Sequence, residues 1–304
     1  MDNTIKNYIN STNSITIMKF NPYLEVLLAA TIGGSSGIFI RYLDLPVTTI
    51  TFFRLFIPAL ILFIYLKWKK VKLFRRNIKL MLLGSSLNAA RLFLFIMAYM
   101  YTSIANGVII LFTWPIFAAI FSILILKEKV NWKTLGLILL AFVGIIMMYI
   151  NKEFSFTNKD FVGMTLMLVS AICLAFVIII FKEVLKENDN IETVFYQNIV
   201  GAVVFIPFIF INFPKPTIPQ IGLGAGYGIL CGMVTFILFF SALKRLKVAV
   251  YSLLCYWEVV AGIFFGFLFF KEIITWNMFV GGACIILSSL LIRKNAEKKQ
   301  CKVT

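Results

Sequence analysis

Long runs of apolar residues, separated by short polar segments, dominate this sequence. Most runs are close to the roughly 20 residues that an α-helix needs to cross a bilayer. Apolar residues are consecutive within the runs and do not alternate with polar ones, which favours helices over barrel strands. The pattern predicts an all-α integral membrane protein. Its ten transmembrane helices are expected at 24–40, 47–66, 78–101, 104–126, 132–150, 161–181, 193–211, 218–243, 248–270 and 274–292.

The composition agrees with a membrane protein. Of the 304 residues, 61% are hydrophobic and 14% are charged, whereas a soluble domain carries about 25% charged residues. The net charge of +16 would suit a nucleic-acid partner, but its distribution argues against one. With the N-terminus inside and ten helices threaded, 22 of the 29 Lys and Arg residues fall inside and five outside. We therefore expect a multi-pass protein of the cytoplasmic (inner) membrane with both termini cytoplasmic. Its basic segments should attract anionic lipid head groups.

The remaining segments carry little chemistry. Residues 1–20 are polar, rich in Asn, Ser and Thr, and lack the apolar core of a signal peptide; Met18 is an alternative start. Residues 293–304 form a basic tail that we expect in the cytoplasm. The five cysteines show no paired or metal-like spacing, and the chain has no histidine. There is no nucleotide-binding P-loop motif. We expect no cofactor, no metal and no enzyme activity.

The sequence repeats itself. "LKEKVNW" at 126–132 matches "FKEIITW" at 270–276 at an offset of 144 residues, and Arg54 pairs with Gln197 at an offset of 143. The repeat predicts a first five-helix unit at 21–150, a connecting loop at 151–160 and a second five-helix unit at 161–292. An odd number of helices in each unit gives the two units opposite orientations in the membrane. Inverted repeats of this kind are typical of alternating-access carriers, whose substrate site lies between the repeats.

The sequence resembles a known family. The two five-helix halves, the Arg in "FFRLFIPA" and the segment "SIANGVIILFTWPIFAAIFSILILKEKVNW" resemble the EamA family of the drug/metabolite transporter superfamily. The second copy of that segment is "KVAVYSLLCYWEVVAGIFFGFLFFKEIITW", and the resemblance covers about 24–292. It implies a secondary transporter of small organic solutes. Where the first copy has Pro115, the second has Val259, which we expect to make the ninth helix stiffer.

Few ionisable side chains fall well inside the predicted helices. A charge at the bilayer centre is costly and usually faces a cavity or a partner. Arg91 and Glu258 lie near the centres of the third and ninth helices, and Asn88 shares a helix face with Arg91. We expect Arg91 to bind a carboxylate or phosphate, and Glu258 to bind an amine or carry a coupling proton. The alternative is a purely structural Arg91–Glu258 pair.

Other candidates are weaker. Trp114, Tyr99, Tyr256 and Trp257 are expected as walls of the site that can also form hydrogen bonds, although packing explains most aromatic residues in this chain. Ser35 and Ser36 are candidate hydroxyls beside small residues that also suit close helix packing. The polar residues that we assign to structural roles are Arg54, Gln197, Glu128 and Glu272.

Together these patterns predict a secondary active transporter of an amino acid or another zwitterionic or anionic metabolite. Within the same fold, the alternatives are an exporter of amphipathic drugs and an exchanger of nucleotide-derived metabolites. From other classes, an integral-membrane enzyme, a non-transporting sensor and a channel stay open. The partners are the solute and the lipid bilayer, with no nucleic acid. A homodimer and a monomer are the alternatives for the assembly.

Overall fold

The computed structural model describes residues 21–71, 77–149, 158–211 and 216–300. The expectations for residues 1–20, including Met18, for most of the connecting loop and for residues 301–304 lie outside these ranges. The secondary structure of the described residues is entirely helical. In chain order the elements are α2 (Pro22–Gly34), α3 (Ser36–Leu43), α4 (Val47–Trp68), α5 (Ile78–Tyr101), α6 (Ile104–Leu111), α7 (Trp114–Leu124), α8 (Trp132–Tyr149), α9 (Asn158–Glu187), α10 (Asn190–Ile211), α11 (Ile218–Tyr227), η1 (Gly228–Val234), α12 (Thr235–Arg245), α13 (Val248–Cys255), α14 (Trp257–Phe270) and α15 (Trp276–Gln300).

The predicted ten-helix membrane fold is confirmed. In the described part of the chain, nine helical stretches are long and apolar enough to cross a membrane, and Trp276–Ile292 is a shorter apolar helix. Four of the ten spans are not continuous α-helices: α2 with α3, α6 with α7, α11 with η1 and α12, and α13 with α14. Interrupted helices leave backbone groups without their usual helical partners, and transporters use such groups near substrate sites.

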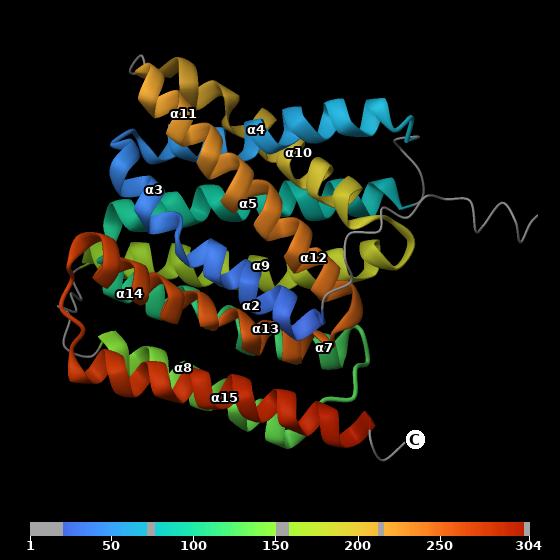
Figure 1. Cartoon of the computed structure of the whole chain (residues 1–304), viewed down its shortest axis with the longest axis vertical. Coiled ribbons are helices and arrows are strands. Elements are labelled where there is room, and N and C mark those ends of the chain that lie inside the picture. Colours follow the sequence, from blue (N-terminus) through green and yellow to red (C-terminus); the bar gives the residue numbers. More distant parts are fainter. Residues whose placement is uncertain (1–20, 72–76, 150–157, 212–215, 301–304) are drawn as a thin grey trace, which may run out of the picture.

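The helices pack in pairs that mix the two halves of the chain. The most extensive contacts are those of α5 with α9, α8 with α15 and α4 with α10. In Figure 1, α8 and α15 run side by side along the lower edge, while α4, α10 and α11 lie at the top. Between these layers α2 contacts α12 and α14. The central helices of the two halves therefore meet in the interior.

The repeat seen in the sequence is visible in the backbone. Lys127 and Lys271, which are 144 positions apart, both adopt the left-handed conformation, with φ of 53° and 55°. One residue later the two turns form the same type of hydrogen bond, from Glu128 N to Ser122 O and from Glu272 N to Gly266 O. In Figure 1 the α7–α8 connection lies at the right and the α14–α15 connection at the left. Equivalent turns thus lie at opposite ends of the molecule, as an inverted repeat requires.

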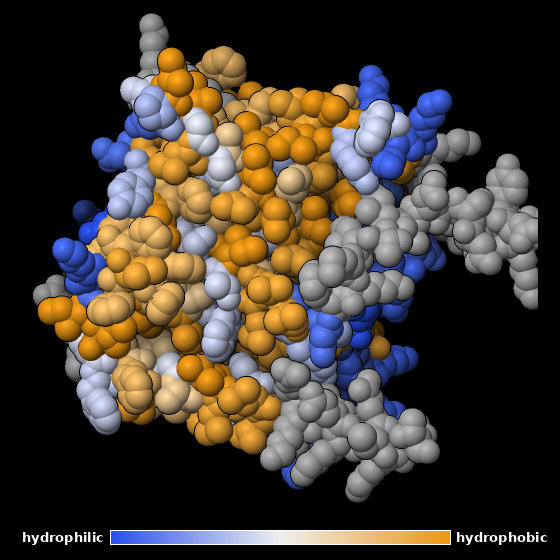
Figure 2. Space-filling view, in the orientation of Figure 1, coloured by the Kyte–Doolittle hydropathy of each residue, from blue (hydrophilic) through white to orange (hydrophobic). Residues whose placement is uncertain are grey.

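The surface separates into an apolar belt and a charged end. Large apolar side chains such as Phe161, Phe267 and Leu290 are more than half exposed or close to it, which suits contact with lipid tails. Figure 2 shows a broad hydrophobic surface with hydrophilic residues gathered along its right side. We call this side the basic end. Its described cations are those at the ends of α4, α9 and α12, at the start of α8 and in the α7–α8 and α12–α13 connections: Lys67, Lys69, Lys70, Lys129, Lys133, Lys186, Lys244, Arg245 and Lys247.

Two close helix crossings depend on glycine. A Cβ on Gly144 of α8 would lie 2.6 Å from the carbonyl oxygen of Gly281 in α15, so the backbones touch directly. In the other crossing, Pro58 cannot donate a hydrogen bond to the carbonyl of Arg54 one turn earlier. Gly232 of η1 packs against that carbonyl and the Pro58 ring. The proline in α4 and the π-helical turn η1 therefore fit each other.

Candidate functional site

Two of the interrupted spans meet at Ser35. This residue lies between α2 and α3, and its hydroxyl donates to the carbonyl of Ile32 at 2.6 Å. The thiol of Cys231, from η1, reaches the same carbonyl at 3.4 Å and lies 3.9 Å from the Ser35 hydroxyl. The break in the first span is thus packed against the π-helical turn of the eighth. Ser36, the second predicted hydroxyl, is the first residue of α3 and is half-buried.

The carboxylate of Glu258 points into this region from a third interrupted span. A Cβ added to Gly33 would lie 3.1 Å from Glu258 Oε1, so the carboxylate rests against the bare backbone of α2. Gly34 is equally close to the backbone of Glu258 and to Ala261. Glu258 lies in the first turn of α14, where unpaired N–H groups and the helix dipole favour a negative charge. Small residues in α2 leave space for this carboxylate, and the start of α14 favours its negative charge.

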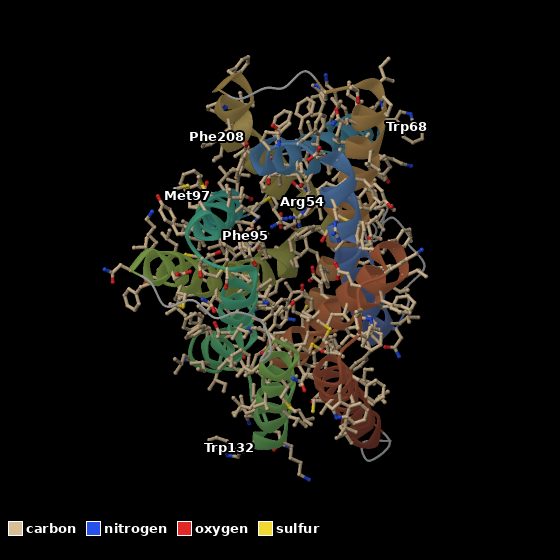
Figure 3. The ribbon with its side chains drawn as sticks, turned by 90° about the vertical axis from the view of Figure 1, so that its left-hand side faces the viewer. Arg54, Trp68, Phe95, Met97, Trp132 and Phe208 are labelled. Carbon is tan, nitrogen blue, oxygen red and sulfur yellow. The ribbon has the colours of Figure 1, made fainter. Side chains whose placement is uncertain are left out.

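Two arginines act electrostatically on Glu258. Arg54 comes from α4 and Arg91 from α5, and both charges interact with the carboxylate. Figure 3 shows Arg54 in the interior of the molecule, whereas Trp68 and Trp132 lie at its periphery. The Arg54 guanidinium also lies over the ring of Phe236, 5.4 Å from its centroid. The structure therefore brings together one acid from the second half and two cations from the first.

These three charges are not neutralised by direct contact. Within the described residues, the ion pairs closer than 4.0 Å are Arg41–Glu272, Lys186–Glu183 and Arg245–Glu25. Arg91 instead donates from Nε to the side-chain oxygen of Asn88 at 3.2 Å, and both residues are buried. Within the described residues, its guanidinium nitrogens Nη1 and Nη2 form no hydrogen bond or ion pair. The carbonyl of Arg91 accepts a bond from Ser170, which fixes α5 to α9.

The ninth span is interrupted in spite of Val259. Sequence analysis predicted a stiffer helix there because Val259 replaces the proline of the first copy. That expectation is wrong: α13 ends at Cys255 and α14 starts at Trp257, with Tyr256 bonded to Leu253 three residues back. Tyr256 is fully buried, and its hydroxyl donates to the carbonyl of Phe112 at 3.1 Å. Phe112 itself separates α6 from α7, so tertiary packing produces the break without a proline.

The remaining predicted aromatics lie at separate places. The indole of Trp257 donates to Thr31 at 3.0 Å and lines a crevice of about 140 Å³ between α2 and α15. Trp114, at the start of α7, is buried in the main apolar core. The ring of Tyr99 covers Gly107 and stacks edge-on with Phe95, 5.0 Å between centroids. Among the described residues, these rings form no hydrogen bond or cation–π contact with Arg91 or Glu258.

The predicted structural polar residues also occupy different environments. Gln197 is buried in α10. Glu128 accepts a hydrogen bond from the backbone N–H of Val248 at 2.9 Å. Glu272 accepts a bond from Arg41 at 3.0 Å, and both side chains are more than half exposed. Glu128 and Glu272 therefore lie at helix connections, away from Glu258.

Sequence reasoning missed several residues around the acid. Gly33 leaves room for the carboxylate of Glu258, and Cys231 packs against the break between α2 and α3. Tyr227 interacts electrostatically with both Arg54 and Glu258. The sequence shows how deep a residue lies along its helix, but it does not show that Arg54 of α4 and Glu258 of α14 interact. A usable signal was Pro58, one turn after Arg54, because it marks an irregular stretch of helix beside a charge.

A ten-helix membrane bundle with interrupted spans and charged side chains in its interior is the architecture of a membrane transporter. The model of the EamA-like transporter family matches residues 20–150 and 161–294. The chain belongs to this family. The resemblance recognised in the sequence is thereby confirmed.

Individual relatives are distant but cover most of the chain. The pseudopaline exporter CntI of Pseudomonas aeruginosa (strain UCBPP-PA14) is 27% identical over 82% of this chain and 87% of its own length. The S-adenosylmethionine uptake transporter of Rickettsia bellii is 25% identical over 66% of this chain and 67% of its own. A protein crystal structure superimposes with a TM-score of 0.79 at 14% identity, covering 89% of this chain and 97% of the other. That structural similarity concerns the fold alone.

Proposed function

We propose that this protein is a secondary carrier that moves a small zwitterionic or anionic organic solute by alternating access. The observation that carries the proposal is the group formed by Arg54, Arg91 and Glu258. All three interact electrostatically inside the membrane-spanning bundle, and among the described residues none of them forms a direct ion pair. Ionisable groups at such depth are costly and typically mark a transport pathway.

The chemistry of the three residues sets the class of solute. A guanidinium can bind a carboxylate through two parallel hydrogen bonds. A carboxylate such as Glu258 can bind an ammonium group or exchange a proton. S-adenosylmethionine, which appears in the name of one relative, carries both an ammonium and a carboxylate group. An amino acid or a derivative with both groups therefore fits the site, and two arginines against one glutamate also accommodate a second negative charge.

Orientation follows from the distribution of charge. We place the basic end in the cytoplasm because Lys and Arg residues concentrate on the cytoplasmic side of membrane proteins. The anionic lipids of that leaflet would contact the lysines of this end. Carrier rather than enzyme activity agrees with the transporter names of the relatives.

The test is solute flux into proteoliposomes, with amino acids, their nucleoside derivatives and organic anions as substrates. Wild-type protein should give saturable flux of at least one zwitterionic or anionic solute. Arg91→Ala, Arg54→Ala and Glu258→Gln should each lower it at least tenfold while thermal unfolding shows a folded protein. Lys133→Gln, which removes an exposed charge at the basic end, is the matched control and should transport normally.

Two results would contradict the proposal. In the first, the three variants fold and transport as well as the wild type, which would make the charges incidental. In the second, the wild type gives flux only with uncharged amphipathic compounds, which would favour a drug exporter of the same fold. A dependence of the wild-type flux on a pH gradient that Glu258→Gln abolishes would assign proton coupling to Glu258.

A further inference from the structure

The linker between α12 and α13, at the basic end, is held by side chains from other parts of the chain. The ammonium group of Lys182 in α9 donates to the carbonyls of Leu243 at 2.6 Å, Lys244 at 3.3 Å and Leu246 at 2.6 Å. The last carbonyls of a helix have no partner within the helix, so Lys182 supplies the missing donor for α12. Arg245 in the same turn forms an ion pair with the buried Glu25 of α2.

The same linker is joined to the first half of the chain by two reciprocal hydrogen bonds. Glu128, in the α7–α8 loop, accepts from the backbone N–H of Val248, the first residue of α13, at 2.9 Å. In return the Lys247 ammonium donates to the carbonyl of Lys129 at 2.7 Å. A side chain of the first repeat thus caps a helix of the second repeat. Val248 is fully buried, so its N–H needs this acceptor.

At the opposite end, the equivalent glutamate has a different partner. Glu272 is the repeat counterpart of Glu128, and its turn has the same left-handed backbone and the same hydrogen bond. Its carboxylate is more than half exposed and accepts a bond from Arg41 of α3. The counterpart of Val248 is Ile104, the first residue of α6.

A carboxylate can be accommodated at the start of α6. The side chain of Ser103 accepts from the N–H of Asn106, the third residue of α6, at 3.3 Å. Capping by Ser103 therefore uses the third N–H of the helix, whereas the contact equivalent to Glu128–Val248 would use the first. The two caps do not compete for the same donor.

We propose that Glu128 and Glu272 are alternating clamps of the transport cycle: Glu128 holds the start of α13 in the state seen here, and Glu272 leaves Arg41 to hold the start of α6 when the basic end opens. The proposal rests on the alternating-access function proposed above. In an inverted-repeat carrier the two repeats move relative to each other around a fixed site. A contact that a residue of one repeat makes in one state is therefore made in the other state by the equivalent residue of the second repeat.

Hydrogen–deuterium exchange of the linker at 244–250, measured on the full chain in proteoliposomes, tests the proposal without any known solute. Glu128→Ala removes the acceptor for Val248 and should speed exchange of this segment about tenfold, as for the loss of one buried hydrogen bond. Lys129→Ala, which removes only an exposed side chain next to Glu128, should leave exchange unchanged.

The decisive variant is Arg41→Ala, at the other end of the molecule. It frees Glu272 to clamp α6, which should shift the population toward the state open at the basic end. Exchange of 244–250 should then rise about two- to fivefold, the factor expected for an exposed ion pair. Glu272→Ala in the Arg41→Ala background should return it to the wild-type rate.

Unchanged hydrogen–deuterium exchange of the linker in Arg41→Ala would overturn the proposal of alternating clamps. If Glu128 were only a local cap, a change at Arg41, which does not touch the linker, would have no effect on it. This variant alters an exposed side chain, so the test remains usable even where Glu128→Ala fails to fold. Failure of the proposed transport function would give a different result from failure of the clamp proposal. In that case the exchange coupling between Arg41 and the linker is present but no screened solute is moved.

Discussion

The hydroxyl of Tyr256 bonds to the carbonyl of Phe112, and these two residues are repeat counterparts, 144 positions apart. Equivalent positions can touch only near the axis that relates the two repeats. Both residues also lie where their spans are interrupted, between α6 and α7 and between α13 and α14. The two broken helices therefore meet at the centre of the molecule, two residues before Glu258.

The Tyr256–Phe112 contact gives a first prediction. Tyr256→Phe keeps the ring but leaves the carbonyl of Phe112 without its donor, which should lower the free energy of unfolding by about 1 kcal/mol. Thermal unfolding in detergent measures this loss. Tyr101→Phe, at a side chain that is 41% exposed, should have no measurable effect. Equal stability of Tyr256→Phe and the wild type would mean that the bond does not hold the two breaks together.

A second prediction concerns the space beside Glu258. In Gly33→Ala the new Cβ would lie 3.1 Å from Glu258 Oε1, a contact tight enough to displace the carboxylate by a few tenths of an ångström. Displacement of a positioned group by this order lowers transport more than stability. We expect flux to fall about tenfold in proteoliposomes.

Gly37→Ala is the matched control, because a Cβ at Gly37 meets nothing within 4 Å. Gly37 lies four residues after Gly33, in α3 beyond the break at Ser35, and Ala favours a helix at either position by similar amounts. Normal flux in Gly33→Ala would show that the carboxylate does not need its present place. Loss of flux in Gly37→Ala would show that helix flexibility, and not the space for Glu258, is what glycine provides.

A third prediction tests the α8–α15 crossing. In Gly144→Ala the new methyl group would lie 2.6 Å from the carbonyl oxygen of Gly281, and a backbone atom cannot rotate away. Overpacking of this kind should lower the free energy of unfolding by about 1–3 kcal/mol. Gly136→Ala on the same helix meets nothing within 4 Å and should be neutral or slightly stabilising. Similar unfolding temperatures for both variants would argue that the two helices can separate freely.

Much of this architecture was predictable because the polarity of a bilayer changes only along its normal, so apolar runs of the right length mark the spans. The number of spans and the repeat followed from apolar length and from the spacing of "KE" motifs, which mark equivalent turns at Lys127 and Lys271. Glu258 and Arg91 are predicted as site residues because an ionisable residue stands out within an apolar helix, and that prediction stays untested.

The rest depends on contacts that are not encoded locally. The sequence suggests a structural role for Arg54 because it shows only the depth of this residue. The long-range electrostatic interaction of Arg54 with Glu258 depends on how α4 packs against η1. No proline marks the break at Tyr256 in the sequence. The break is accompanied by a hydrogen bond from the Tyr256 hydroxyl to the carbonyl of Phe112 in the other repeat. The sequence gives no account of which partner Glu128 or Glu272 selects, because their turns have nearly the same local residues.

A last prediction follows from the environment of Glu128 in the α7–α8 loop. Its pKa is raised above the ordinary value for Glu, 4.5, chiefly because burial disfavours the charged form. The N–H of Val248, the nearby Lys182 and Lys247, and the Ser122 hydroxyl all favour the carboxylate, but they only partly offset this effect. In the released state proposed above, we expect Glu128 to face water and to have the ordinary pKa of a glutamate.

The sign of the pH dependence follows from this difference. The state with the higher pKa, in which Val248 is held, gains stability from protonation. This contribution is complete below the ordinary pKa and is lost as the pH rises through the raised pKa of the held state. Each unit by which the pKa is raised changes the ratio of held to released protein about tenfold. Exchange of 244–250, corrected for the intrinsic pH dependence of amide exchange, should therefore speed up across this window. Glu128→Gln keeps an acceptor oxygen and cannot ionise, so its exchange should stay slow and show no step. A step of equal size in Glu128→Gln would assign the titration to a different group.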